Sequence, residues 1–94
     1  MTWTWDPAKA AANHAKHGVS FDLAALVFDD PLALSLPDPH PEADRWRTIG
    51  RPMTDLPTLL LVVHTEPGAE DAPGRIISAR RATRHERRAY EEAG

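Results

Sequence analysis

Arginines near the end of the chain form the group of residues best suited to chemistry. Positions 75 to 88 hold one acid, Glu86, and six arginines, which are Arg75, Arg80, Arg81, Arg84, Arg87 and Arg88. This stretch carries a net charge of +5, whereas the whole chain carries −3. A planar guanidinium donates two parallel hydrogen bonds to a phosphate or a carboxylate. The cluster therefore indicates a phosphate-bearing ligand, such as nucleic acid, or a docking surface for an acidic protein.

A solvated helix face is the alternative interpretation of this cluster. Arg87/Glu91 and Arg88/Glu92 stand four residues apart, a spacing that allows ion pairs along one helix. The like-charged pair Arg84/Arg88 gains nothing from that arrangement, so helix pairing explains only part of the pattern.

Metal chemistry has little support in the sequence. The chain has no cysteine, and its five histidines are scattered: His14, His17, His40, His64 and His85. Zinc sites in proteins are built from grouped cysteine, histidine and carboxylate ligands. The sequence also lacks a glycine-rich phosphate loop, a nucleophile elbow and an HExxH motif. We therefore expect no metal and no other cofactor.

Length and composition indicate one soluble domain over residues 1–94. The chain is 41% hydrophobic and 27% charged, which is ordinary for a folded globular protein. The longest apolar run, residues 59–63, is far too short to span a bilayer. The first residues, MTWTWDPAK, contain an acid and no apolar run, unlike a secretory signal. We expect a cytoplasmic protein with no membrane partner.

Local signals predict the elements that must position the arginines. Asp6 and Pro7 are typical of a helix start and Gly18 of a helix end. Thr83 and Glu86 form a capping box ahead of the final helix. The predicted elements are a short edge strand at 1–5, helices over 8–17 and 21–28, strands over 32–36, 45–51, 58–64 and 75–81, and a helix from about 84 to 92. This order predicts an α+β fold, in which a helical hairpin and a C-terminal helix pack on an antiparallel sheet of about four strands.

Four segments resemble the BrnT toxins of bacterial type II toxin–antitoxin modules. They are WDPAKAAANHAKHGVSF, VFDDPLALSLPD, RWRTIGR and RIISARRATRHERRAYEE, which match in register over nearly the whole chain. The resemblance implies a compact fold like that of the RelE ribonucleases, and RNA cleavage that inhibits translation. It also implies neutralisation by a BrnA-like antitoxin, which would supply the contact with operator DNA.

Metal-free RNA cleavage needs a base for the 2′-hydroxyl, cations for the charge on the pentavalent phosphorus and an acid for the leaving 5′-oxygen. Arg80 is the first candidate cation, because a strand would fix its position; the alternative is a salt bridge that locks the final helix. Arg45, Arg47 and Arg51 form a second set with the spacing of one strand face.

Proton transfer has several candidates, each with a structural alternative. His17 ends the first helix, where the helix dipole favours a charged imidazolium, but it can equally serve only as a cap. Tyr90 can donate a proton or stack on a base, although packing is the commoner role of such a tyrosine. Glu66 and Glu86 are candidate bases, and Glu86 already has its capping role.

The predicted site follows from these assignments. The candidate catalytic residues are Arg80, Arg45, His17 and Tyr90, and the candidate RNA-binding residues are Lys9, Lys16, Arg47, Arg51, Arg81, Arg84 and Arg87. The alternative function is a non-catalytic module that binds nucleic acid or docks a protein through its arginines. A helix-turn-helix reader is disfavoured, because residues 21–28 carry no cation.

Overall fold

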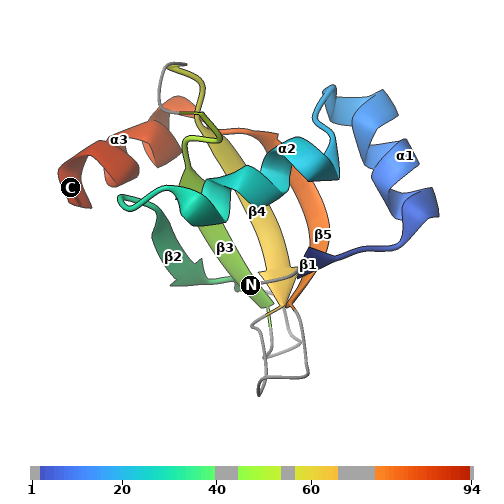
Figure 1. Cartoon of the computed structure of the whole chain (residues 1–94). Coiled ribbons are helices and arrows are strands. Elements are labelled where there is room, and N and C mark those ends of the chain that lie inside the picture. The colour runs from blue at the N-terminus through green and yellow to red at the C-terminus, as the bar shows by residue number, and fades with distance from the viewer. Residues whose placement is uncertain (1–2, 40–44, 54–56, 66–73, 94) are drawn as a thin grey trace.

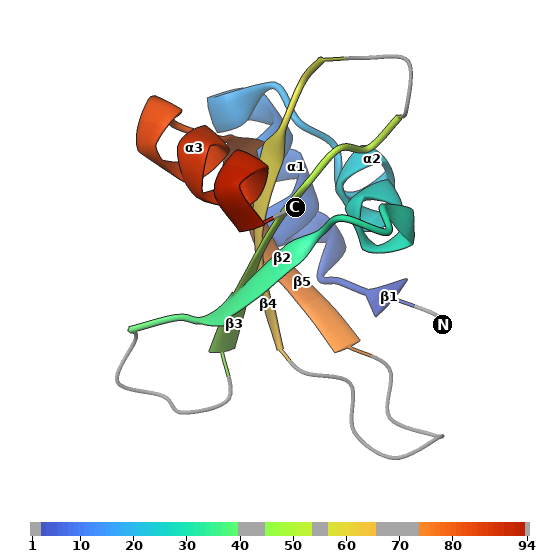
Figure 2. The same cartoon turned by 90° about the vertical axis from the view of Figure 1, so that its left-hand side faces the viewer.

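A mixed sheet separates two layers of helices in the computed structural model, which describes residues 3–39, 45–53, 57–65 and 74–93 (Figures 1 and 2). The elements are β1 (Trp3–Thr4), α1 (Pro7–His17), α2 (Phe21–Ala25), the 3₁₀ helix η1 (Leu26–Asp29), β2 (Leu34–Pro37), β3 (Arg45–Gly50), β4 (Leu60–Thr65), β5 (Gly74–Arg81) and α3 (Arg84–Ala93). Helices α1 and α2 lie on one side of the sheet and α3 lies on the other. The predicted α+β class is confirmed.

The described strands form a five-stranded sheet in the order β1-β5-β4-β3-β2. Strands β2 to β5 are an antiparallel meander, as predicted. The short edge strand predicted at residues 1–5 is present as β1, but the predicted sheet of about four antiparallel strands did not include its parallel pairing with the start of β5, through Trp3 and Gly74. This pairing joins residues about 70 positions apart, so no local sequence signal reports it. Gly74 permits the contact, because a side chain there would collide with the Trp3 ring.

Capping side chains define both ends of α1. The Asp6 carboxylate accepts a hydrogen bond from the Ala8 amide at 2.9 Å, and Pro7 occupies the first turn. Gly18 ends the helix with a left-handed backbone, φ 71°, and its amide donates to the His14 carbonyl. The predicted helix boundaries are therefore confirmed.

The second predicted helix changes its winding part-way. Ser20 caps α2 as expected, because its hydroxyl accepts a hydrogen bond from the Leu23 amide at 3.1 Å. The α-helix ends at Ala25 and continues as the 3₁₀ helix η1. A tightened last turn is common where a chain must leave a helix, and here Asp30 and Pro31 follow directly.

Strand β4 is covered on both faces, as its unbroken Leu/Val run predicted. Leu60 and Val62 join the core beneath α1 and α2, whereas Leu61 packs with Ile49 and Tyr90 beneath α3. The sheet is therefore the central layer, and two separate apolar clusters fix the helices to it.

A buried asparagine closes the sheet edge beyond β1. The Asn13 amide nitrogen of α1 donates to the carbonyls of Ala79 and Val19, at 2.9 and 3.1 Å, and its oxygen accepts from the Ala79 amide. The side chain thus takes the place of a neighbouring strand next to β5. Because Asn13 is only 8% exposed, these bonds are shielded from water.

No helix within the described residues is long and apolar enough to cross a membrane.

Candidate active site

The sheet face beneath α3, which we call the α3 face, gathers the predicted arginines of two strands. Arg80 on β5 lies opposite Leu61, which in turn lies opposite Ile49 on β3. Arg47 occupies the neighbouring row of the same face, opposite Val63. One arginine from each of the two sets that the sequence could not place relative to one another, Arg80 and Arg47, therefore lies on this face.

Arg80 pairs end-on with a glutamate of α3. Its Nη1 donates to Oε1 of Glu86 at 2.8 Å and its Nη2 donates to Oε2 at 2.9 Å. Nη1 also donates to the Arg81 carbonyl at 3.2 Å. Among the described residues, the Nε–H of Arg80 has no acceptor, so the edge formed by Nε and Nη2 is left for a ligand. The salt bridge to the final helix is present, and it orients the guanidinium without covering that edge.

Glu86 also caps the helix from which it projects. Its Oε1 accepts a hydrogen bond from the Thr83 amide at 2.8 Å, and its own amide donates to the Thr83 hydroxyl at 3.2 Å. The predicted capping box is therefore confirmed. The hydrogen bonds from Arg80, helped by those of Thr83, lower the pKa of Glu86 to about 2 despite its partial burial. Glu86 in turn raises the pKa of Arg80, so both groups stay charged.

A hollow of about 210 Å³, which we call the α3 pocket, lies beside this ion pair between α3 and the sheet. Its apolar lining consists of Leu36, Ile49, Leu61 and Ala89, and its polar lining of Arg47, Thr83, His85 and Glu86. Glu86 is the link between the pocket and Arg80, since it lines the first and bonds the second. A ligand in the pocket would thus be separated from Arg80 by the Glu86 side chain.

The arginines of β3 have different surroundings. Arg47 lines the α3 pocket, and its Nε lies 3.5 Å from Oδ1 of Asp38, too far for a good hydrogen bond. Arg45 is half-buried on the same face of β3 but does not line the pocket. Arg51 follows the end of β3 rather than extending it, so the predicted one-face set of three is wrong at this position.

Arg51 and Tyr90 belong to a second polar cluster, centred on Asp30. The Tyr90 hydroxyl donates to Oδ2 of Asp30 at 2.7 Å, and the Arg51 amide donates to the same oxygen at 2.8 Å. Burial and the bond to Asp30 raise the pKa of Tyr90. Tyr90 is 5% exposed and does not line the α3 pocket, so its geometry is that of a packing residue.

The carboxylate of Asp30 holds this cluster together. Partial burial opposes its ionisation, but the hydrogen bonds from Arg51, Leu32 and Tyr90 outweigh burial and lower its pKa. Asp30 therefore ties α3 to the ends of η1 and β3.

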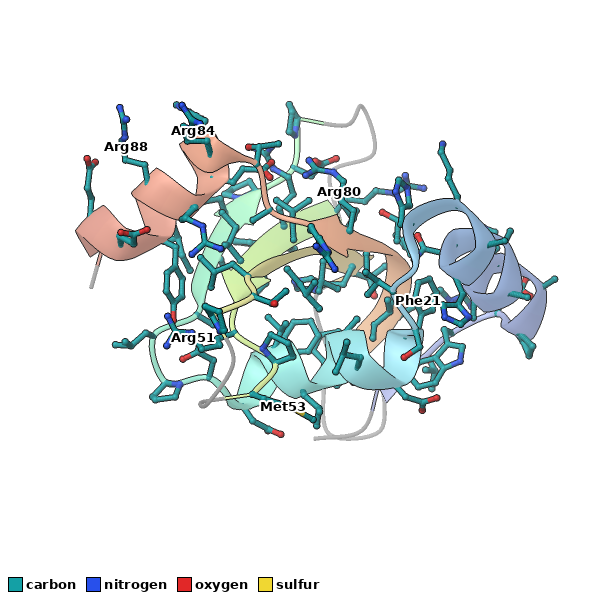
Figure 3. The ribbon with its side chains drawn as sticks, turned by 90° about the horizontal axis from the view of Figure 1, so that it is seen from above. Phe21, Arg51, Met53, Arg80, Arg84 and Arg88 are labelled. Carbon is teal, nitrogen blue, oxygen red and sulfur yellow. The ribbon has the colours of Figure 1, made fainter. Side chains whose placement is uncertain are left out.

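The other cations differ in exposure. Arg81, Arg84 and Arg88 are exposed, and Figure 3 shows the last two pointing away from the body of the molecule. Arg87 is half-buried and donates through Nη2 to the Pro57 carbonyl at 3.1 Å, which fastens α3 to the segment before β4. Lys9 and Lys16 are exposed on α1, at the other end of the molecule from α3.

The histidine that lies at the candidate site is not the one that the sequence predicted. His17 is half-buried at the end of α1, and the structure does not bring it to the α3 pocket. His85 lines the pocket, although sequence reasoning treated it only as a scattered metal candidate. Its place inside the arginine cluster, next to Glu86, was the available signal. Glu66 and His40 lie outside the described residues.

His64 has a structural environment. It is 5% exposed, its Nε2 lies 2.6 Å from the Thr48 hydroxyl, and its Nδ1 lies 2.8 Å from the Thr65 carbonyl. Trp3 and Phe28 meet its ring edge to face. Within the part of the chain that the structure describes, no three histidine or acidic side chains are grouped in a way that could hold a metal ion.

Comparisons with known proteins identify the family. The family model described as "Ribonuclease toxin, BrnT, of type II toxin-antitoxin system" matches residues 5–86. The chain belongs to the BrnT family. The match includes Arg80, Thr83, His85 and Glu86, and ends before the pocket residue Ala89. No curated protein sequence matches the chain.

A solved BrnT structure has the same fold. The crystal structure of the ribonuclease toxin BrnT from Brucella abortus is 25% identical in sequence and superposes with a TM-score of 0.67. The alignment covers 89% of this chain and 100% of the Brucella chain. The fold of this chain is therefore similar to that of the Brucella toxin over most of its length.

Proposed function

We propose that this BrnT-family protein is a metal-independent endoribonuclease that cleaves RNA and so inhibits translation in the cytoplasm. The observation that supports the proposal most directly is the orientation of Arg80, whose open Nε–Nη2 edge faces away from its bond to Glu86. Glu86 itself lines the α3 pocket. Two parallel donors on one edge suit the oxygens of a phosphate.

The chemistry would use Arg80 as the positive charge. As the 2′-oxygen attacks, negative charge develops on the phosphorus oxygens, and a preoriented guanidinium stabilises that charge more than it stabilises the ground state. His85 is the titratable side chain of the pocket suited to moving a proton near neutral pH, and it replaces His17 in the proposed site. Arg47 would hold the RNA backbone on the same face.

Cleavage can be tested with the purified chain. Incubation with single-stranded RNA in EDTA should give products that end in a 2′,3′-cyclic phosphate, and production of the chain alone in cells should stop protein synthesis. Arg80→Ala should abolish both effects. Folded protein that binds RNA without cutting it would instead leave the non-catalytic binding module as the better account.

Membership in a toxin–antitoxin family implies an antitoxin partner. We propose a BrnA-like protein that covers Arg80, Arg84 and Arg87 with acidic side chains and alone contacts operator DNA. Such an interface is steered by charge, so added salt should slow association more than it speeds dissociation. RNA should compete with the antitoxin, and RNA binding to the intact complex as strongly as to the free chain would exclude masking.

A pair of charge reversals gives this test a matched control. Arg84→Glu/Arg88→Glu changes two exposed cations of α3, whereas Lys9→Glu/Lys16→Glu makes the same change in net charge on α1. Slower association is expected only for the α3 pair. An equal effect of both pairs would mean that net charge, and not the α3 surface, steers the antitoxin.

A further inference from the structure

We propose that the α3 pocket binds one unstacked base of a single-stranded RNA, next to the phosphate that Arg80 holds. The inference rests on the proposed function, because it assigns to the site a place for the base as well as one for the phosphate. It goes further, because it names the part of the molecule that would make the chain prefer some RNA bases over others.

None of the aromatic side chains is fully exposed. Proteins that bind single strands commonly stack bases on exposed aromatic rings. All six aromatic side chains of this chain are described, and each is buried or half-buried: Trp3, Trp5, Phe21, Phe28, Trp46 and Tyr90. Trp3 stacks on Phe28 with ring centroids 3.8 Å apart, and Trp5 meets Phe21 edge to face. None of these rings lines the α3 pocket, so a base bound there would make its apolar contacts with aliphatic side chains.

The α3 pocket supplies such a contact. Three neighbouring strands present apolar side chains to it, namely Leu36, Ile49 and Leu61. On the opposite wall the small side chain of Ala89 leaves room for a ligand. Leu36 is 40% exposed, so part of its side chain is accessible to a ligand in the pocket. A volume of about 210 Å³ is below the range of sites for drug-sized ligands and suits one flat group.

Polar groups at the pocket rim can read the edge of a base. Imidazole and guanidinium groups stack on bases, and His85 and Arg47 line the pocket. The Nε of Arg47 is buried and has no hydrogen-bond partner among the described residues, although it lies 3.5 Å from Asp38. The Thr83 hydroxyl accepts a bond from the Glu86 amide, which leaves its proton for an acceptor on a base.

The position next to Arg80 requires a single strand. In a duplex the bases are stacked and their pairing edges are engaged, so a pocket of this size cannot receive one. Glu86 bonds Arg80 and also lines the pocket, so the bound base would belong to a nucleotide adjacent to the phosphate.

Binding can be measured apart from cleavage with 2′-fluoro tetranucleotides, which lack the attacking hydroxyl. Fluorescence anisotropy would compare four homopolymers with an abasic tetranucleotide of the same charge. The natural chain should bind at least one base-bearing oligonucleotide more tightly than the abasic one by about tenfold or more, which corresponds to about 1.4 kcal/mol. Ala89→Leu, which fills the pocket, should remove this difference and keep the weak binding of the abasic strand.

Two further variants make the test decisive. Ala93→Leu adds the same side chain to an exposed position of α3 and should keep the preference for a base. Leu36→Ala removes part of the apolar floor and should weaken the preference even if Ala89→Leu does not fold. Folded Ala89→Leu with an unchanged preference, or equal binding of abasic and base-bearing strands by the natural chain, would overturn the proposal.

The outcomes also separate this inference from the proposed function. Cleavage of ordinary RNA without a base preference would reject the base pocket and keep the ribonuclease. A base preference without any cleavage would reject the ribonuclease and keep the pocket. If Ala89→Leu blocks antitoxin binding while the base preference is unchanged, the pocket receives an antitoxin side chain and the inference is wrong.

Discussion

Arg80 and Glu86 meet end to end across the junction of β5 and α3, with Nη1–Oε1 and Nη2–Oε2 distances of 2.8 and 2.9 Å. The same glutamate oxygen that accepts Nη1 also accepts the Thr83 amide at 2.8 Å. One carboxylate therefore fixes both the first turn of the helix and the plane of the guanidinium. Substitution of Arg80 and substitution of Glu86 should therefore have different effects on stability and on activity.

Replacing Arg80 should affect activity far more than stability. Arg80→Ala removes the proposed phosphate-binding group, and loss of one such donor typically costs a factor of about 10² to 10³ in rate. The side chain is 36% exposed and Glu86 keeps its bond to Thr83, so unfolding free energy should fall by about 1 kcal/mol or less. Arg80→Lys should not restore cleavage, because an ammonium lacks the two-pronged edge. Cleavage assays and urea titrations provide the comparison, and a folded, fully active Arg80→Ala would remove Arg80 from the site.

Glu86→Gln should reduce activity through Arg80. Glutamine also serves in a capping box, so α3 should persist, while the guanidinium loses its charged partner. We expect cleavage to fall by about tenfold, less than for Arg80→Ala, because the positive charge is still present. A nuclear magnetic resonance spectrum of the arginine Nε–H groups should show altered order at Arg80. Unchanged cleavage would mean that this ion pair serves only stability.

Acid should remove the stabilising effect of Glu86. Its pKa is lowered from 4.5 to about 2 in the folded chain, mainly by the bonds from Arg80. The stabilisation is therefore complete above about pH 5 and is lost as the pH falls from 4.5 towards 2. In urea titrations, the gap in unfolding free energy between the natural chain and Glu86→Gln should close over this range. A gap that is constant down to pH 2.5 would contradict the assignment.

The two histidines should behave oppositely when replaced. His85→Gln removes the proton-transfer group proposed for the α3 pocket and should lower the rate by about 10²-fold or more while changing its pH profile. His17→Gln changes a residue at the end of α1 and should leave both rate and profile intact. Steady-state cleavage between pH 5 and 9 tests the pair, and the reverse result would restore the role first predicted for His17.

Tyr90→Phe should lower stability and spare cleavage. The change removes the hydroxyl that donates to the ionised Asp30 at 2.7 Å, a kind of bond worth about 1.5–3 kcal/mol. The ring would still pack against Ile49 and Leu61. Calorimetry and a cleavage assay on the same sample test this expectation. Loss of cleavage at full stability would identify Tyr90 as the acid that the sequence suggested.

Asn13→Ala should destabilise the fold strongly. It would leave the Ala79 amide and the Ala79 and Val19 carbonyls without their partner in a buried place, at about 1–3 kcal/mol for each unsatisfied group. His14→Ala, at the exposed neighbouring position, should change the unfolding free energy by about 0.5 kcal/mol or less. Equal effects of the two substitutions would show that the edge of β5 does not depend on Asn13.

The sequence predicted features that depend on neighbouring residues. The Asp6 and Gly18 signals give the ends of α1, and the Thr83–Glu86 capping box gives the start of α3. These succeed because a cap acts within one turn of helix. The unbroken apolar run of β4 likewise reports burial on both faces.

Features that depend on distant residues escaped prediction. The α3 pocket joins Leu36, Ile49 and Leu61 to Ala89, and only strand register and the tilt of α3 bring them together. Arg51 departs from its expected face because β3 ends one residue earlier, where the Arg51 amide turns to Asp30. The packing of α3 on the sheet also places His85 at the pocket.

The position of Glu86 on α3 has a consequence for synthesis of the chain. Protein chains emerge from the ribosome with the N-terminal part first, and folding follows that order. The strand that carries Arg80 precedes α3, and Ala89 lies further along the same helix. While α3 is still inside the exit tunnel, the guanidinium has no partner to set its plane and the pocket has no second wall. In a growing chain Arg80 therefore lacks its Glu86 partner. The proposed site can form only after α3 has left the ribosome.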